Sequence, residues 1–178
     1  SGSGKDGVEE LLQQTSAYID QRSIDKKVYP KQIAFNSIPF VDCFLENNYT
    51  REEMKMVWET HKILDENISV NPTAVRVPVL VGHAESIYIE TEKEIDIELA
   101  KNCLNEFAGI SVIDNVQEVD FPTSFEHGHG TDDVYVGRIR KGLSKNNSLN
   151  LWVVADNVRK GAALNSIQIA ENLVGSEM

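Results

Sequence analysis

Two residues with clear chemical capacity lie near the middle of the chain, Arg76 and His83. Arg76 stands between two valines, and an arginine in apolar surroundings needs an anionic partner. That partner is either a carboxylate in a structural salt bridge or a bound carboxylate or phosphate, which the planar guanidinium holds in bidentate fashion. His83 follows Gly82 and is either a packing or surface residue or a general acid/base, because imidazole titrates near neutral pH.

A second pair, Glu52 and Lys55, lies on a predicted helix. Thr50 to Glu53 reads Thr-Arg-Glu-Glu, a capping box that predicts a helix from Thr50 to about Leu64. Residues three apart on the first turn project from adjacent positions, so both side chains can reach one ligand, and an anion is favoured there. A solvated surface lysine remains the alternative. The expected inner stripe of the helix is Met54, Val57, Trp58 and His61.

A third group, around His127 and His129, superficially resembles a metal site because Asp132 and Asp133 follow it. The segment is rich in glycine and has no rigid element to fix ligand geometry, so we predict a solvated loop and no metal. The sequence contains no Ser/His/Asp set, glycine-rich phosphate loop or GxGxxG motif. Without further information, the residues indicate only an anion pocket built from Arg76, His83, Glu52 and Lys55.

Composition excludes several classes of function. With 178 residues, 41% of them hydrophobic, the chain can form a real core as one domain. Its net charge of -11 repels phosphate backbones, so nucleic acid is not an expected partner. No apolar run approaches the roughly 20 residues that cross a bilayer, so we expect no membrane role and a cytoplasmic protein. Cys43 and Cys103 lack metal or CxxC spacing and are expected to be buried reduced thiols.

The elements that must position these residues follow no regular βαβ alternation. This pattern predicts an α+β fold with a mixed, largely antiparallel sheet covered by helices. An ideal strand would place Arg76 and His83 on opposite faces, so we expect a kink between Pro78 and Gly82 to bring them together. The expected helices are 6–20, 50–64, 95–107 and 159–174; the expected strands are 74–81, paired centrally with 86–90, then 110–116, 134–139 and 149–154, with an irregular edge piece at 33–39.

In combination, these motifs resemble the C-terminal substrate-binding and dimerisation domain of aspartate-semialdehyde dehydrogenases, part of the glyceraldehyde-3-phosphate dehydrogenase-like fold. The arginine followed seven residues later by histidine, after the Glu-Glu-x-Lys helix, is specific as a set. The matching segments occur in family order and span most of the chain: 49–56 with 59–63, 75–79 through 82–86, 136–141, and 152–157 with 160–163.

The resemblance implies a reaction and residue roles. The family converts L-aspartyl 4-phosphate and NADPH to L-aspartate 4-semialdehyde and phosphate through a cysteine thioester, in lysine, methionine and threonine biosynthesis. His83 would be the general acid/base. Arg76 would bind the substrate's α-carboxylate, Glu52 its α-ammonium group and Lys55 its phosphate. Asn157, Ser1 and Gly2 would contact the cofactor NADP.

The resemblance also implies what lies elsewhere. In the family, the nucleotide-binding domain, the catalytic cysteine and a substrate glutamine precede the Ser-Gly-x-Gly that matches residues 1–4. Cys43 and Cys103 do not match that cysteine, so we expect these 178 residues to be inactive alone. We expect a substrate-binding and dimerisation domain over 1–158, a helix over 159–178 that packs on the nucleotide-binding domain, and a homodimer formed through the sheet.

Two alternatives remain from the sequence. The first is a stand-alone dimerisation or regulatory module without a catalytic half. The second is a related acyl-phosphate reductase, such as an N-acetylglutamyl-phosphate reductase. Glu52 distinguishes the second alternative, because a free α-amino group needs a carboxylate partner whereas an acetylated one does not.

Overall fold

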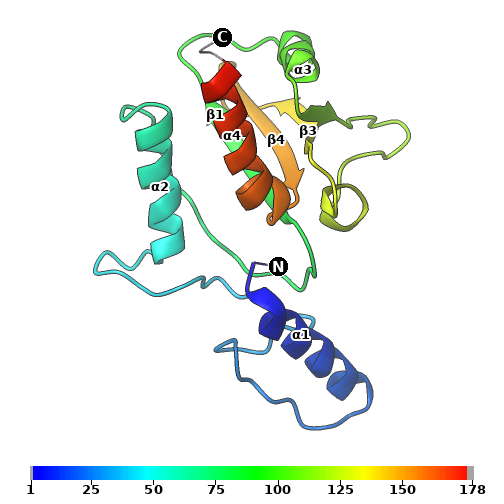
Figure 1. Ribbon diagram of the computed structural model, residues 1–178. Coiled ribbons are helices and arrows are strands. Elements are labelled where there is room, and N and C mark those ends of the chain that lie inside the picture. Colours follow the sequence, from blue (N-terminus) through cyan, green and yellow to red (C-terminus); the bar gives the residue numbers. More distant parts are fainter. Residues whose placement is uncertain (1, 176–178) are drawn as a thin grey trace. The chain divides into compact units, whose positions relative to one another are not determined.

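The computed structural model describes residues 2–175 and divides into two compact units. The first unit comprises residues 3–78, and the second comprises residues from 79 onward together with Gly2. Figure 1 shows the elements of both units in sequence colours. No helix among residues 2–175 combines the length and apolar character needed to cross a membrane.

The first unit contains helix α1 (Gly4–Ile19), helix α2 (Arg51–Ile63) and irregular connections. Two polar side chains of α1 bind the connection that follows it, which loops back along the helix (Figure 1). The buried Glu10 carboxylate accepts hydrogen bonds from the amides of Lys27 and Val28 at 2.8 and 2.5 Å. The buried Gln14 amide oxygen accepts from Ile33 N at 2.9 Å. These bonds satisfy backbone groups that have no strand to pair with.

Helix α2 begins as the sequence predicts. The Thr50 hydroxyl accepts from the Glu53 amide at 3.3 Å, and the Glu53 carboxylate accepts from the Thr50 amide at 2.7 Å, which completes the capping box. The expected inner stripe is confirmed in part: Met54, Val57 and His61 are half-buried. Trp58 is 51% exposed, so its assignment to the inner stripe is wrong; the buried residue of this helix is Glu53.

The second unit is built on a four-stranded sheet in the order β1-β4-β3-β2. Strand β1 (His83–Glu90) pairs antiparallel with β4 (Ser148–Ala155), β4 pairs antiparallel with β3 (Val134–Lys141), and β2 (Ile110–Val112) pairs parallel with β3. The α+β class with a mixed, largely antiparallel sheet is therefore confirmed. The register of β3 shifts between Gly137 and Arg140, where Arg138 adopts a left-handed φ of 55°.

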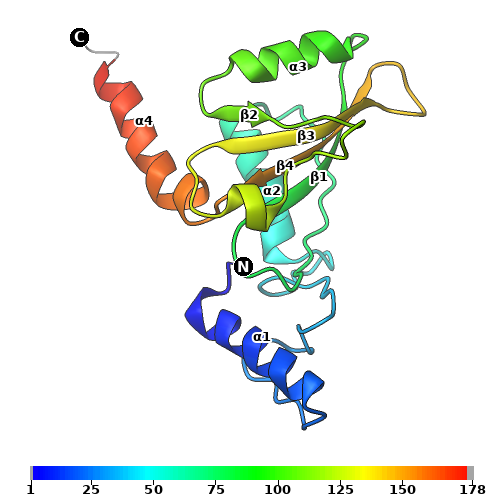
Figure 2. The ribbon, with the colours of Figure 1, turned by 90° about the vertical axis from the view of Figure 1, so that its right-hand side faces the viewer.

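Helix α3 (Ile97–Glu106) packs on this sheet (Figure 2). Asp96 caps the helix by accepting from the Leu99 amide at 2.9 Å. The apolar side of α3 meets the buried centre of the sheet because Ile97, Ala100 and Leu104 pack against it. The four buried residues at that centre are Val136, Ile139, Leu149 and Leu151.

The expected central strand 74–81 is wrong. The structure has a single bridge at this place, between Arg76 and Ile38, and an irregular backbone elsewhere in the segment. Pro78 has no N–H to donate to a ladder, which explains why the apolar run does not continue as a strand. Strand β1 consequently pairs with β4 and lies at an edge of the four-stranded sheet. Of the expected edge piece at 33–39, Ile38 alone forms a bridge in the described residues.

The C-terminal helix begins with a π-helical turn (Arg159–Ala163) and continues as α4 (Leu164–Gly175). Figure 2 shows α4 projecting away from the strands of its unit. None of its residues is buried, and its apolar side chains are largely open to solvent: Ile167, Ile169, Leu173 and Val174.

Candidate functional site

Arg76 is held by its backbone and by an aromatic ring of the first unit. Its amide and carbonyl both pair with Ile38 at 2.9 Å, and Ile38 is 3% exposed. Arg76 is half-buried, and its guanidinium carbon lies 5.8 Å from the centre of the buried Tyr29 ring, a distance at which the ring face attracts a cation. Within residues 2–175, no carboxylate lies within 4.0 Å of this guanidinium. The salt-bridge interpretation of Arg76 therefore finds no support in the described part of the chain.

Glu52 and Lys55 lie together on the first turn of α2, as their spacing predicts. Lys55 Nζ lies 3.1 Å from Glu52 Oε2, and each side chain keeps nearly half of its surface exposed. The hydrogen bond from Lys55 to Glu52 raises the pKa of the lysine. The turn thus presents one positive and one negative group side by side, both open to a ligand.

His83 begins β1, opposite Ala155 of β4. Gly82 before it has φ +82°, and a Cβ there would meet the carbonyl oxygen of Ala155 at 3.2 Å, so only glycine suits this turn. The Gly82 amide donates to Asn157 Oδ1 at 3.0 Å, which brings Asn157 next to the histidine in the second unit.

Gly2 also belongs to the second unit and lies beside His83. Its φ is +77°, and a Cβ on it would come within 3.1 Å of His83 Nε2. Any larger residue would therefore crowd the imidazole. The structure brings together three of the predicted residues here, Gly2, His83 and Asn157, whereas Ser1 lies outside the described residues.

Asp156 fixes the turn that carries Asn157. The carboxylate is 4% exposed and accepts three backbone N–H groups: Gly130 at 2.9 Å, Val158 at 2.8 Å and Arg159 at 3.0 Å. Burial raises the pKa of this carboxyl, but the hydrogen bonds from Arg159, Gly130 and Val158 outweigh burial and lower it overall. An ionised Asp156 therefore stabilises the fold around Asn157.

We expect Asp156→Asn to lower the free energy of unfolding by about 1–3 kcal/mol, because the amide NH₂ faces a backbone donor. A carboxyl whose pKa is lowered on folding contributes stability above its unfolded pKa of about 3.9 and loses it as pH falls through the folded value. The difference between wild type and variant in urea denaturation should thus be constant from pH 5 to 7 and shrink below about pH 4. Asp132→Asn, at an exposed ion pair with Arg159, is the control; an equal effect of both changes would contradict this role.

The segment around His127 differs from the expected solvated loop. Residues Ser124–Gly128 form a π-helical turn, capped by the Thr123 hydroxyl. His127 is half-buried, its Nδ1 accepts the Thr123 amide at 3.1 Å, and its ring lies 5.7 Å from that of Tyr135. Its role is therefore to hold this turn. Residues 2–175 contain no group of three or more His, Cys, Asp or Glu side chains placed to bind a metal.

The two cysteines remain free thiols. The expectation that both are buried is wrong, because Cys43 is half-buried and Cys103 is exposed on α3. Cys103 lies on the solvent side of α3, whose other side covers the sheet. Its apolar neighbours Ala100 and Leu104 suggested burial, but they lie on the side that faces the sheet.

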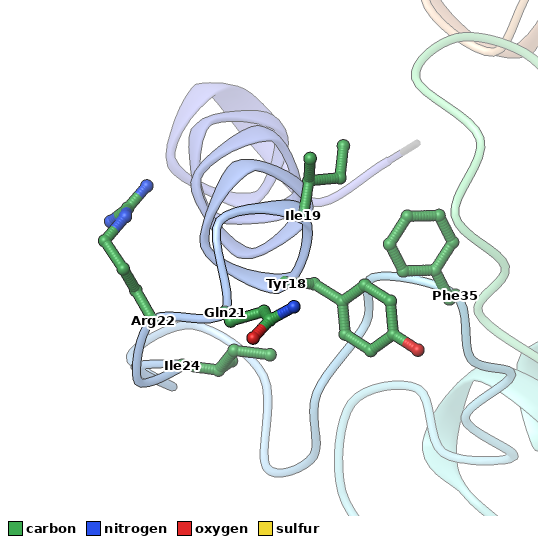
Figure 3. Close-up of a pocket in the computed structure, with 6 residues that line it drawn as sticks. All are labelled: Tyr18, Ile19, Gln21, Arg22, Ile24 and Phe35. Carbon is green, nitrogen blue, oxygen red and sulfur yellow. The ribbon is translucent and has the colours of Figure 1, made fainter.

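A shallow hollow of about 600 Å³ lies at the end of α1 in the first unit. Figure 3 shows the rings of Tyr18 and Phe35 next to each other near Ile19; their centres are 4.9 Å apart and their planes are tilted by 51°. None of the predicted site residues lines this hollow, which is formed by Tyr18, Ile19, Gln21, Arg22, Ile24 and Phe35.

One residue that supports the site, Asp156, was not predicted from the sequence. It gave a local signal, since an Asp before a helix start often accepts backbone amides. The expected kink between Pro78 and Gly82 stays a prediction, because Arg76 and His83 belong to different units.

The mixed four-stranded sheet with helix α3 packed on it is the fold of a dehydrogenase dimerisation domain. Residues 1–160 match the family model described as "Semialdehyde dehydrogenase, dimerisation domain", and the chain belongs to this family. It is 55% identical to the aspartate-semialdehyde dehydrogenase of Shewanella violacea over 98% of this chain and 51% of that protein. The chain thus spans about half the length of the curated relatives it matches.

Solved structures agree. The chain is similar to aspartate-semialdehyde dehydrogenase II of Vibrio cholerae, crystallised in complex with ASA, at a TM-score of 0.94 and 49% identity over 100% of this chain and 52% of that one. It is also similar to the Candida albicans enzyme crystallised with NADP, at a TM-score of 0.64 and 26% identity, over 79% of this chain and 44% of that one.

Proposed function

We propose that this chain is the substrate-binding and dimerisation part of an NADP-dependent aspartate-semialdehyde dehydrogenase, which reduces L-aspartyl 4-phosphate to L-aspartate 4-semialdehyde and phosphate. The observation that carries the proposal is the half-buried Arg76, whose guanidinium lies beside Tyr29 without a carboxylate partner among the described residues. A cation fixed in this way suits an anionic ligand. Membership of the semialdehyde dehydrogenase family supports the choice of ligand.

The first unit supplies charges that match each end of an aspartyl substrate. Arg76 binds the α-carboxylate through two parallel N–H donors. Glu52 accepts from the α-ammonium group, and Lys55, whose ammonium is kept charged by its neighbour, binds the phosphate. When the ligand binds, the ion pair between Glu52 and Lys55 would be replaced by two ion pairs, one between Glu52 and the ligand's ammonium group and one between Lys55 and its phosphate.

The second unit supplies proton transfer. His83 acts as general acid/base, because an exposed imidazole at a strand end can both accept and donate a proton near neutral pH. Gly82, bonded to Asn157, fixes the backbone just before it. The lack of a side chain at Gly2 leaves the imidazole uncrowded.

The same residues fit a nicotinamide cofactor. Gly2, which has no side chain, and the amide side chain of Asn157 lie close to His83. Together with Ser1 they would hold the nicotinamide end of NADP. The nicotinamide would supply the hydride when bound. The crystal structure of the Candida albicans protein with NADP supports the choice of cofactor.

Neither cysteine of this chain is assigned as the nucleophile. Cys43 lies on a connection and Cys103 lies on α3. Both are distant in sequence from the turns that carry Gly2, His83 and Asn157. We therefore propose that the 178 residues do not turn over substrate alone.

We further propose a homodimer, a substrate-binding and dimerisation domain over 1–158, and a helix over 159–178 whose exposed apolar residues pack on a nucleotide-binding domain. A monomer in gel filtration of the complete protein would count against the dimer.

Glu52→Gln tests the substrate in the complete gene product that includes these residues. Loss of the carboxylate should lower kcat/KM for L-aspartate semialdehyde about 10- to 100-fold, because a hydrogen bond to a charged group is lost. Activity on N-acetylglutamate semialdehyde should remain negligible. Glu59→Gln, exposed on the same helix, is the control. A wild-type protein that prefers the acetylated substrate would favour an N-acetylglutamyl-phosphate reductase, and no activity on either would favour a regulatory module.

A further inference from the structure

Glu53 has more hydrogen bonds than a capping box requires. The box uses one carboxylate oxygen, Oε2, which accepts from Thr50 N at 2.7 Å and Thr50 Oγ1 at 3.0 Å. The other oxygen, Oε1, accepts from Ala74 N at 3.0 Å. Glu53 is 8% exposed, so both oxygens are withdrawn from water and depend on these partners.

This second bond joins the two parts of the proposed substrate site within the first unit. On one side, Glu53 lies on the helical turn that carries Glu52 and Lys55. On the other, Ala74 lies two residues before Arg76, whose backbone is fixed by Ile38. Only Val75 separates Ala74 from Arg76, so a shift of Ala74 moves the Arg76 backbone with it.

We propose that Glu53 is a positioning residue that sets the distance between the ammonium- and phosphate-binding turn of α2 and the carboxylate-binding Arg76. The proposal rests on the function proposed above. An aspartyl ligand is short and charged at both ends, so its recognition depends on the separation of the cationic and anionic groups that bind it. Glu53 itself touches no substrate.

The charge state of Glu53 agrees with this role. The hydrogen bonds from Thr50 N and Ala74 N lower the pKa of the carboxyl, so the acceptor stays ionised through the neutral range. A glutamine would keep the shape but turn an NH₂ group toward one of the two backbone donors. Either the cap or the link to Ala74 would be lost.

The test compares Glu53→Gln with two variants in the complete gene product. Ala74→Pro removes the same bond from the donor side and leaves the capping box intact, because proline has no N–H. Thr50→Ala removes the cap hydroxyl and leaves the Glu53–Ala74 bond intact. Thermal unfolding verifies that each variant is folded before kinetics are measured.

We expect Glu53→Gln and Ala74→Pro each to raise the KM for L-aspartate semialdehyde about tenfold, with kcat and the KM for NADP changed less than about twofold. The double variant should be no worse than either single variant, because both remove one bond. Thr50→Ala should lower thermal stability without this rise in KM. Equal KM values for Thr50→Ala and Glu53→Gln, or a normal KM in Ala74→Pro, would overturn the proposal.

Hydrogen–deuterium exchange separates this proposal from the proposed function. Glu53→Gln and Ala74→Pro should both speed amide exchange in residues 75–77 relative to wild type and Thr50→Ala. If wild type lacks the dehydrogenase activity, the proposed function fails, and exchange alone decides whether Glu53 holds the segment. If wild type is active and exchange in 75–77 is unchanged by Glu53→Gln, the positioning role fails and the function stands.

Discussion

His83→Ala in the complete gene product is expected to lower kcat by about 10²- to 10⁴-fold, the usual contribution of a positioned general acid/base. The KM for L-aspartate semialdehyde should change little, because the imidazole is assigned to proton transfer and Arg76 to binding. The pH profile of kcat/KM should also lose the limb near neutral pH that a histidine produces. Both are measured by steady-state kinetics between pH 5.5 and 9.

The control for His83 is His129→Asn. His129 is exposed and belongs to the segment after the π-helical turn, so its removal should leave kcat and the pH profile unchanged. A His83→Ala variant with kcat within threefold of wild type would contradict the acid/base assignment. Thermal unfolding verifies that both variants are folded before their kinetics are compared.

Arg76→Leu is expected to lower kcat/KM by about 10²- to 10³-fold, mostly through KM, because two charge-assisted hydrogen bonds to a carboxylate are lost. Arg76→Lys should recover little, since an ammonium cannot provide the planar pair of donors. Thermal stability should change little in Arg76→Lys, because no described carboxylate depends on the guanidinium. The measurement is kcat and KM for L-aspartate semialdehyde in each variant.

Arg22→Lys is the matched control, at an exposed pair with Asp20 in the same unit. It should leave kcat/KM unchanged. A large loss of stability in Arg76→Leu with unaltered KM would instead assign Arg76 a structural role. That result would remove the observation on which the proposed function depends.

Local patterns predicted the elements that form through local interactions. The capping box at Thr50 placed the start of α2 correctly because its hydrogen bonds lie within one turn. The valine, isoleucine and aromatic residues of β3 and β4 also predicted these strands, because such side chains suit a pleated and partly buried surface. The pairing of Glu52 with Lys55 followed from helical spacing alone.

Features that depend on distant residues were not predictable. The run from Ala74 to Val81 resembles a strand by composition, yet the partner available to Arg76 is Ile38, which offers one bridge. The ring of Tyr29 beside the guanidinium and the bond from Ala74 to Glu53 join segments that are far apart in sequence. No local pattern encodes such contacts, so the environment of Arg76 required the structure.

The most direct test of the central claim is phosphate-dependent formation of NADPH from L-aspartate semialdehyde and NADP, followed at 340 nm. The complete gene product that includes these residues should form NADPH only when phosphate is present, and the 178-residue polypeptide alone should form none. Absence of NADPH from the complete product, or steady turnover by the 178 residues alone, would contradict the assignment of this chain as the substrate-binding part of the enzyme.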